Sequence, residues 1–213
     1  MTTDSKALEG YIAEQKNRLS ANPQCGVTHY NLGVALLSRG DFLEAERAFR
    51  DAVTHSPTLV EAYVQLGGLA LQSGDLEGCL NYNKMAAEGR PMFATPQGNI
   101  GFVYMQMGEP SKAARALERA VKLDPNFIQA LATLGNAYMM EGDLERAEKV
   151  LRQALDKEPM FGPAWNNLAL VLLERGEHAN ALECIDKAVA TGYDVRPELL
   201  EEVAPYRSQA QPA

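Results

Sequence analysis

The chain has 213 residues, of which 46% are hydrophobic and 23% are charged, the composition of an ordinary soluble globular protein. Its formal net charge of −8 argues against a general nucleic-acid binder, because such proteins present a basic surface to the phosphates. Its three cysteines, Cys25, Cys79 and Cys184, are too few and too far apart for a disulfide framework or a zinc site.

The N-terminal segment is polar and predicts no export signal. Residues 1–10 lack the basic start and the apolar core of a signal peptide. No stretch approaches the roughly 20 apolar residues of a membrane span. We therefore expect a cytoplasmic protein without membrane insertion.

One amphipathic helix is predicted over residues 4–20, before Pro23. The apolar side chains that would face the rest of the fold are Leu8, Tyr11, Ile12 and Leu19. We therefore expect residues 1–25 to form an N-terminal capping helix.

A repeat of 34 residues governs the chain from there on. Prolines recur at this spacing: Pro23, Pro57, Pro91, Pro125 and Pro159. So do glycines that an acid follows: Gly40, Gly74, Gly108, Gly142 and Gly176. A second series contains Gly33, Gly67, Gly101, Gly135 and, in the fifth place, Ala169. Three series with one period establish an internal repeat.

Each repeat predicts two antiparallel helices. In the first, an apolar stretch before Gly40 indicates one helix, and residues 42–53 carry Ala45, Phe49 and Ala52 on one face of another. Gly40 is the left-handed residue expected at a helix end, and the acid after it favours the start of the next helix. Because two short helices cannot bury their apolar faces alone, the repeats must stack into an all-α solenoid.

The marks within each unit resemble those of the tetratricopeptide repeat. In the first unit they are Leu32, Gly33, Ala45, Phe49, Ala52 and Pro57, and four more units carry similar sets. The predicted repeats cover residues 26–193, as 26–59, 60–93, 94–127, 128–161 and 162–193. The resemblance implies a right-handed superhelix with the first helix of each pair on its concave face, where such proteins usually bind a peptide or helix of another protein.

A C-terminal cap is predicted over residues 194–213. Pro197 suits the first turn of a helix, and Leu199, Leu200 and Val203 can cover the last repeat. Ser208–Ala213 is expected to be a frayed tail.

Polar side chains recur at one concave offset of the first helices. They are Asn31, Gln65, Asn99, Thr133 and Asn167, and Asn136 and Asn166 lie on neighbouring offsets. An amide offers donors and an acceptor, so such a row can bind the backbone of an extended peptide of any sequence. The alternative is that these residues simply face water.

Charge is nearly absent from the five predicted first helices, which contain only Glu61 and Glu174. One subfamily binds the terminal carboxylate of chaperone tails through cations on its first helices. The matching positions here are Tyr30, Val34, Gln65, Gln129 and Thr133, and none is a cation. We therefore exclude a chaperone-tail adaptor and, for the same reason, nucleic acid in the groove.

Apolar groove positions concentrate in the third and fourth repeats, as Phe102, Met105, Met139 and Met140. Near the second and third repeats, Gly68 and Gly98 either leave a hollow or allow close helix packing. These two repeats are also the least regular, since Cys79, Asn83 and Pro96 depart from the pattern, and irregular packing often accompanies function.

The residues do not predict catalysis. We identify no catalytic constellation of acid, Ser or Cys around His29, His55 or His178, and His29 occupies a packing position. Cys79 and Cys184 also fall on packing positions, which leaves Cys25 as the one candidate reactive thiol. We expect no enzyme, no cofactor and no metal site.

The prediction is a non-enzymatic interaction module or scaffold that binds an extended, largely uncharged peptide segment or a helix of a partner protein in its concave groove. Two alternatives stay open. One is a self-assembling scaffold, a homo-oligomer formed through terminal helices such as that of Leu8, Tyr11 and Ile12. The other is a regulatory subunit of an enzyme complex.

Overall fold

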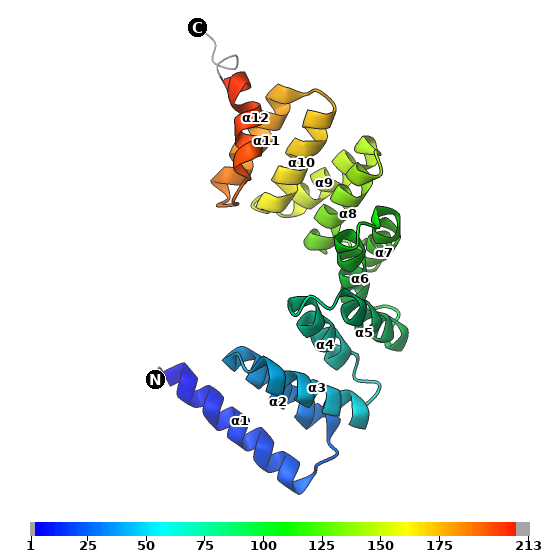
Figure 1. The fold of residues 1–213 in the computed structure, drawn as a ribbon, viewed down its shortest axis with the longest axis vertical. Helices are drawn as coiled ribbons and strands as arrows, with labels where there is room; N and C mark the ends of the chain where they lie inside the picture. The colour runs from blue at the N-terminus through cyan, green and yellow to red at the C-terminus, as the bar shows by residue number, and fades with distance from the viewer. Residues whose placement is uncertain (1–2, 208–213) are drawn as a thin grey trace. The chain divides into compact units, whose positions relative to one another are not determined.

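The computed structural model describes residues 3–207 and contains, within them, twelve helices and no strand (Figure 1). The helices are α1 Thr3–Ala21, α2 Gly26–Arg39, α3 Phe42–His55, α4 Val60–Gln72, α5 Leu76–Gly89, α6 Ala94–Gln106, α7 Pro110–Leu123, α8 Ile128–Met140, α9 Leu144–Lys157, α10 Gly162–Glu174, α11 His178–Ala190 and α12 Pro197–Arg207. The predicted all-α solenoid of helix pairs is thus confirmed. The predicted frayed tail, Ser208–Ala213, lies outside the described residues.

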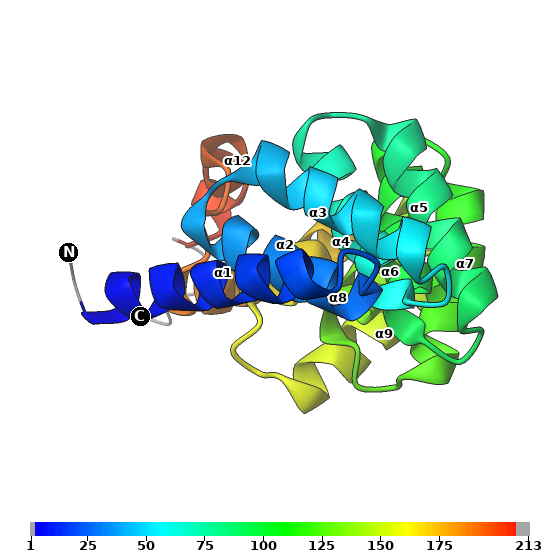
Figure 2. The same ribbon diagram turned by 90° about the horizontal axis from the view of Figure 1, so that it is seen from below.

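The chain divides into two compact units, Met1–Pro96 and Gln97–Ala213, with the division inside α6. In the first unit α1 packs along α2, α2 pairs with α3, and α4 pairs with α5 (Figures 1 and 2). In the second unit α8 pairs with α9 and α10 with α11, while α12 packs on α11. Each unit therefore stacks helix pairs, as the repeat requires.

A glycine in the left-handed conformation ends the first helix of every pair. At Gly40 φ is +90°, and its N–H donates to the carbonyl of Leu37 at 3.0 Å. The N–H of Asp41 donates to the carbonyl of Leu36 at 2.9 Å, which completes the hydrogen-bonded turn. The four equivalent glycines have φ between +71° and +79°, so the predicted role of this series is confirmed.

The acids after these glycines act in two ways. Asp75 and Asp143 accept hydrogen bonds from backbone N–H groups of the next helix, Gly78 at 2.8 Å and Arg146 at 2.9 Å. Asp41 makes no such bond, because its carboxylate pairs with Arg39. The acid that we expect to favour the start of each second helix therefore caps a backbone N–H directly only in α5 and α9.

The second glycine series lets the two helices of a pair approach closely. A Cβ added at Gly33 would lie 2.7 Å from ring carbons of Phe49, which is fully buried. Leu117 packs in the same way on Gly101, and Leu151 on Gly135. In the last pair both places change, to Ala169 and Ile185, and both residues are fully buried. The glycine contacts hold the helices together in the pairs α2–α3, α6–α7 and α8–α9.

The second pair departs from this packing, as the sequence indicates. Asn83, which is fully buried, occupies the place of Phe49, and its Nδ2 lies closest to the position of a Cβ at Gly67. The amide donates to the carbonyl of Cys79 at 2.9 Å, which gives this polar group in the core a hydrogen-bond partner on its own helix.

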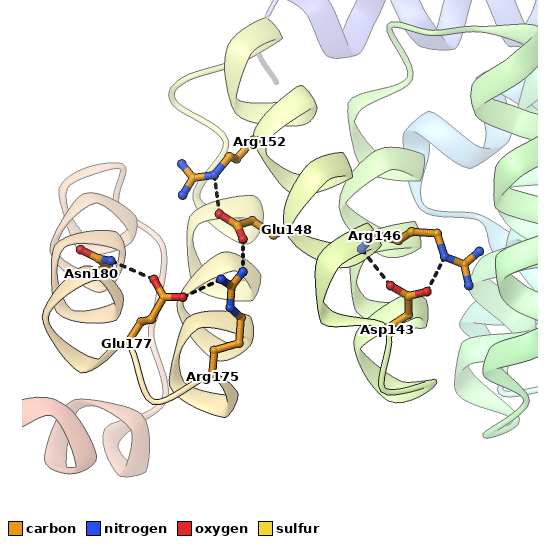
Figure 3. A network of polar contacts seen from close by, with 7 residues as sticks. All are labelled: Asp143, Arg146, Glu148, Arg152, Arg175, Glu177 and Asn180. Atoms are coloured by element: carbon orange, nitrogen blue, oxygen red, sulfur yellow. Dashed lines mark hydrogen bonds and ion pairs between the residues drawn. The ribbon is translucent and has the colours of Figure 1, made fainter.

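Ion pairs on the outer surface link successive helix pairs of the second unit (Figure 3). Glu148 of α9 accepts from Arg152 at 2.7 Å and also pairs with Arg175, which follows α10. Arg175 in turn contacts Glu177 at 2.9 Å, ahead of α11. Because both arginines, Arg152 and Arg175, are exposed, each ion pair adds little stability.

The terminal helices cover the ends of the stack unequally. In α12, Leu199 and Val203 are buried and Leu200 is half-buried, as predicted. In α1, Ile12 is buried as expected. Tyr11 is expected to face the rest of the fold, but it is 43% exposed. Gln15, only 1% exposed, occupies the next position of the buried stripe, which turns Tyr11 towards water.

Candidate peptide-binding surface

The first-helix surface is defined here as the ten predicted binding residues together with three neighbours on the same helices. Its members are Asn31, Val34, Gln65, Gly68, Asn99, Phe102, Met105, Thr133, Asn136, Met139, Met140, Asn166 and Asn167. The first four belong to the first unit and the rest to the second, and each group is described within its own unit.

In the first unit this surface presents two unoccupied amides. Asn31 and Gln65 are half-buried, and neither forms a hydrogen bond with another residue in the described part of the chain. Val34 beside them is 37% exposed, and Gly68 is exposed. Both amides therefore keep their donors and acceptors for an external group.

In the second unit the surface is mainly apolar. Phe102 is 40% exposed and Met140 is 52% exposed, although large apolar side chains are usually better buried. Met105 and Met139 are half-buried against the core of this unit. These flexible thioethers beside an exposed ring form an adaptable apolar lining.

Three of the polar positions in the second unit already make internal contacts. The hydroxyl of Thr133 donates to the carbonyl of Gln129 at 2.7 Å. Asn167 Nδ2 donates to the carbonyl of Ala132 at 3.3 Å, and Asn166 Nδ2 lies 3.4 Å from Asn167 Oδ1. Asn166 is only 8% exposed. This asparagine pair ties α10 to α8, which the regular spacing of polar residues does not reveal.

The remaining polar positions are intermediate in exposure. Asn99 and Asn136 are each half-buried on α6 and α8. The predicted row of polar side chains is therefore uneven, because Asn31 and Gln65 are unoccupied whereas Thr133 and Asn167 have internal partners.

The expected neutrality of the first helices is reinforced by a loop residue. Arg90 Nη1 lies 2.6 Å from Glu61 Oε1, and this hydrogen bond holds the pKa of the Glu61 carboxyl below its ordinary value. Glu174 is exposed at the end of α10. The one carboxylate within the predicted first helices of the first unit, Glu61, is thus neutralised by its own chain.

The two ambiguous glycines differ from each other. A Cβ at Gly68 would meet no heavy atom within 4 Å, so open space surrounds it. At Gly98 a Cβ would lie 2.6 Å from the ring of Phe127, so this glycine allows close packing. Of the two alternatives, Gly68 fits the hollow and Gly98 fits helix packing.

His29 has a structural partner. Its Nε2 lies 2.8 Å from the carbonyl oxygen of Pro23, as Trp165 Nε1 lies 2.8 Å from that of Pro159 at the same offset of the last repeat. The predicted packing role of His29 agrees with this contact. His29 also stacks on His55 at 5.4 Å, and its Nδ1 lies 3.8 Å from Asp51, a proximity that sequence spacing did not indicate.

The three thiols differ in environment. At Cys25, before α2, the hydroxyl of Thr28 donates to Sγ at 3.1 Å and lowers the pKa of the thiol. Burial raises the pKa of Cys79, and that of Cys184 to about 11. No basic neighbour is needed at Cys25, because a hydroxyl one helical turn away stabilises the thiolate.

Two further observations bear on the site. Among residues 3–207, no three His, Cys, Asp or Glu side chains gather where they could hold a metal ion. Within that same range no helix is both long and apolar enough to cross a membrane.

Reasoning from the first helices missed one exposed apolar region on a second helix. Phe42 and Leu43 at the start of α3 are 45% and 75% exposed. The signal was available in the repeat itself, because the residues 34, 68, 102 and 136 positions after Leu43 are all polar or small: Glu77, Ser111, Glu145 and Ala179.

Helix pairs with a 34-residue period, left-handed glycines at their turns and small residues beneath Phe49, Leu117 and Leu151 define a helical-repeat protein. Two family models, both described as tetratricopeptide repeat, match residues 104–168 and 139–200, and residues 29–87. The chain belongs to the tetratricopeptide repeat family.

Several solved structures share this fold. PilF of Pseudomonas aeruginosa has a TM-score of 0.76 at 17% identity, over 87% of this chain and 86% of its own. YrrB, described as a TPR protein with an unusual peptide-binding site, has a TM-score of 0.72 at 19% identity, over 92% and 97%. MamA of Desulfovibrio magneticus RS-1 has a TM-score of 0.70 at 22% identity, over 78% and 94%. At these identities the similarity shows the fold alone. No curated protein matches the sequence.

Proposed function

We propose that this chain is a non-enzymatic binding module that holds an extended, largely uncharged peptide segment, or a helix, of a partner protein along its first-helix surface. Proteins of this family generally mediate protein–protein interaction. The observation that carries the proposal is the exposed Phe102 and Met140 on a surface almost free of charge. Exposed apolar groups of this kind are typical of interaction sites.

The polar groups supply a second part of the recognition. Asn31 and Gln65 keep unoccupied amides, which can donate to and accept from a peptide backbone. Because Arg90 neutralises Glu61, neither sign of charge on the ligand is selected at this end. The peptide-binding site named for YrrB, a protein of the same fold, is consistent with this proposal.

A peptide-display selection against the folded protein tests the proposal. We expect the selected peptides to carry little net charge and one or two large apolar side chains. Their affinity should fall about 10-fold or more for Phe102→Gln, because an anchor contact is worth more than about 1.4 kcal/mol. Met85→Gln is a matched control, since Met85 is 47% exposed on a second helix. Strongly charged peptides, or equal loss in both variants, would contradict the proposal.

An amide variant separates backbone recognition from apolar anchoring. Asn31→Ala together with Gln65→Ala should weaken all selected peptides by a similar factor, because backbone groups do not depend on sequence. Asn81→Ala is the control, since Asn81 is an exposed amide on α5. If Asn31→Ala/Gln65→Ala binds as tightly as wild type, the amides have no part in binding.

The two alternatives stay predictions. Exchange of the terminal helix would have to withdraw Ile12, which is only 3% exposed against its own chain.

A further inference from the structure

Among the large apolar side chains on the helices of the first unit, the most exposed one lies at the start of α3. Leu43 is 75% exposed and Phe42 is 45% exposed. In the other repeats the place of Phe42 is held by Leu76, Pro110, Leu144 and His178, all of them half-buried. The exposure of Phe42 is therefore particular to this repeat. The place of Leu43 is exposed in every repeat, but only here does it carry a large apolar side chain, since its equivalents are Glu77, Ser111, Glu145 and Ala179.

Two shallow hollows meet at these side chains. One, of about 500 Å³, is lined by Phe42 and Leu43 together with Gly40, Asp41, Glu44 and Arg47. The other, of about 280 Å³, is lined by the same two residues and by Glu46, Leu69, Gln72 and Ser73. We call Phe42, Leu43, Leu69, Glu44 and Arg47 the α3 patch. It combines projecting apolar groups with adjacent space, so it can both insert and receive a side chain.

The charges at the rim are complementary to each other. Arg47 is exposed and forms no ion pair among the described residues, whereas Asp41 pairs with Arg39 and Glu46 with Arg50. Glu44 has only a loose contact with Lys16 at 3.8 Å, and its side chain is 56% exposed. One unpaired cation and one weakly paired acid thus border the same hollow, three residues apart on α3.

We infer that the α3 patch binds the α3 patch of a second copy of this chain. In a two-fold interface the same surface meets itself, so each contact occurs twice. Leu43 of each copy then enters the hollow beside Phe42 of the other, and Arg47 of each copy faces Glu44 of the other. A partner with a single charge would satisfy only one of the two rim groups, whereas a second copy satisfies both.

The expected dimer is weak. Stable interfaces bury about 1,600 Å² in total, and the α3 patch offers a few side chains of each copy. Exposed rim charges set orientation more than affinity. The dimer should therefore form only at high protein concentration.

Sedimentation velocity of the full chain over a concentration series, from about 5 to 500 µM, tests this inference because weak interfaces dissociate in that range. We expect the mean mass to rise towards the dimer for wild type and to stay at the monomer for Leu43→Gln. Met85→Gln, the matched exposed apolar residue on α5, should behave as wild type. Circular dichroism checks that each variant keeps its helicity.

A charge exchange tests the predicted pairing. Arg47→Glu and Glu44→Arg should each weaken the dimer about 3-fold or more, and the double variant should recover most of the loss. A wild type that remains monomeric throughout overturns the inference, as does a dimer that Leu43→Gln leaves intact. A dimer lost instead in Tyr11→Gln would assign self-association to the terminal helix. None of these results depends on peptide binding by the first-helix surface.

Discussion

The phenol hydroxyl of Tyr138 in α8 donates a 2.6 Å hydrogen bond to Glu118 Oε1 in α7, so neighbouring repeats of the second unit are joined by one buried tyrosine. Arg146 covers the ring of Tyr138 at 4.3 Å and lies 3.9 Å from Glu118. Tyr138 is only 5% exposed, whereas Glu118 is exposed. The bond thus satisfies a buried donor at the edge of the core.

Tyr138→Phe should lower the free energy of unfolding by about 1 kcal/mol, because Glu118 can be hydrated once the hydroxyl is gone. Urea denaturation followed by circular dichroism measures this. Tyr104→Phe is the matched control at the same offset of the preceding repeat, and its hydroxyl forms no hydrogen bond within the described residues. An equal loss in both variants would show that the bond to Glu118 contributes nothing specific.

The same tyrosine predicts a dependence on alkaline pH. Burial, and then the bond to Glu118, raise the pKa of Tyr138 to about 12. A folded-state pKa above the unfolded value gives stability that is fully present below the unfolded pKa and is lost as the pH rises towards 12. Ultraviolet titration of tyrosinate should show a last step that Tyr138→Phe removes. Persistence of that step in the variant would assign it to another tyrosine.

Two glycines of the first unit should respond oppositely to alanine. Gly33→Ala places Cβ 2.7 Å from the rigid ring of Phe49 and should destabilise the fold by about 1–3 kcal/mol. Gly68→Ala meets no atom within 4 Å and should stabilise it by up to about 1 kcal/mol, because alanine favours the helix. Urea midpoints of the two variants measure the difference. Loss of stability in Gly68→Ala would contradict the open space assigned to that position.

The period alone predicts these contacts within a helix pair. Gly33 and Phe49 recur as Gly101 and Leu117, and as Gly135 and Leu151, so the sequence shows both partners of the contact several times. The ends of the first helices are predictable in the same way, because Gly40 and its four equivalents recur at the left-handed turn that ends each of them.

Contacts particular to one repeat were not predictable in this way. Asn167 fits the row of polar residues by spacing, yet its amide donates to the carbonyl of Ala132 in another repeat. Asp41 has the same place in its repeat as Asp143. Its carboxylate pairs with Arg39, which is itself bound to Glu9 of α1, and so it does not cap the start of α3. Tertiary partners decide between such options, and a single sequence does not contain them.

The thiols should react in a fixed order. Cys25 has a lowered pKa because the hydroxyl of Thr28 donates to its sulfur, whereas burial raises the pKa of Cys79 and Cys184. Iodoacetamide at neutral pH should therefore modify Cys25 well before the other two, as mass spectrometry of proteolytic fragments can measure. In Thr28→Val the pH at half-maximal rate should rise.

A control for this prediction is Thr54→Val, which removes a hydroxyl bound to the carbonyl of Arg50 at 2.8 Å and far from any thiol in sequence. Its alkylation profile should match that of wild type. Modification of Cys184 as fast as Cys25 in the native protein would instead show that burial does not protect this thiol.

The carboxylate at the start of α9 should make the stability of the protein fall as the pH is lowered. Asp143 accepts from the backbone N–H of Arg146 at 2.9 Å and from its side chain at 2.6 Å (Figure 3), and these bonds lower the pKa of the carboxyl. A lowered folded-state pKa gives stability that is present above the unfolded value and is lost as the pH falls through the folded one. Asp143→Ala should therefore be less stable than wild type at neutral pH, by a margin that narrows in acid.

Asp143→Ser separates the two contributions of this carboxylate, because a serine hydroxyl can also accept from the helix N–H but carries no charge. At neutral pH we expect the free energy of unfolding of the serine variant to lie between those of Asp143→Ala and wild type. In acid, the difference in stability from wild type should narrow for the serine variant as it does for the alanine variant, since both lack the titrating group. Urea denaturation of the three proteins at several pH values measures both effects. A margin between wild type and Asp143→Ala that does not change with pH would mean that the charge of Asp143 is without effect and that only its hydrogen bond to Arg146 stabilises the start of α9.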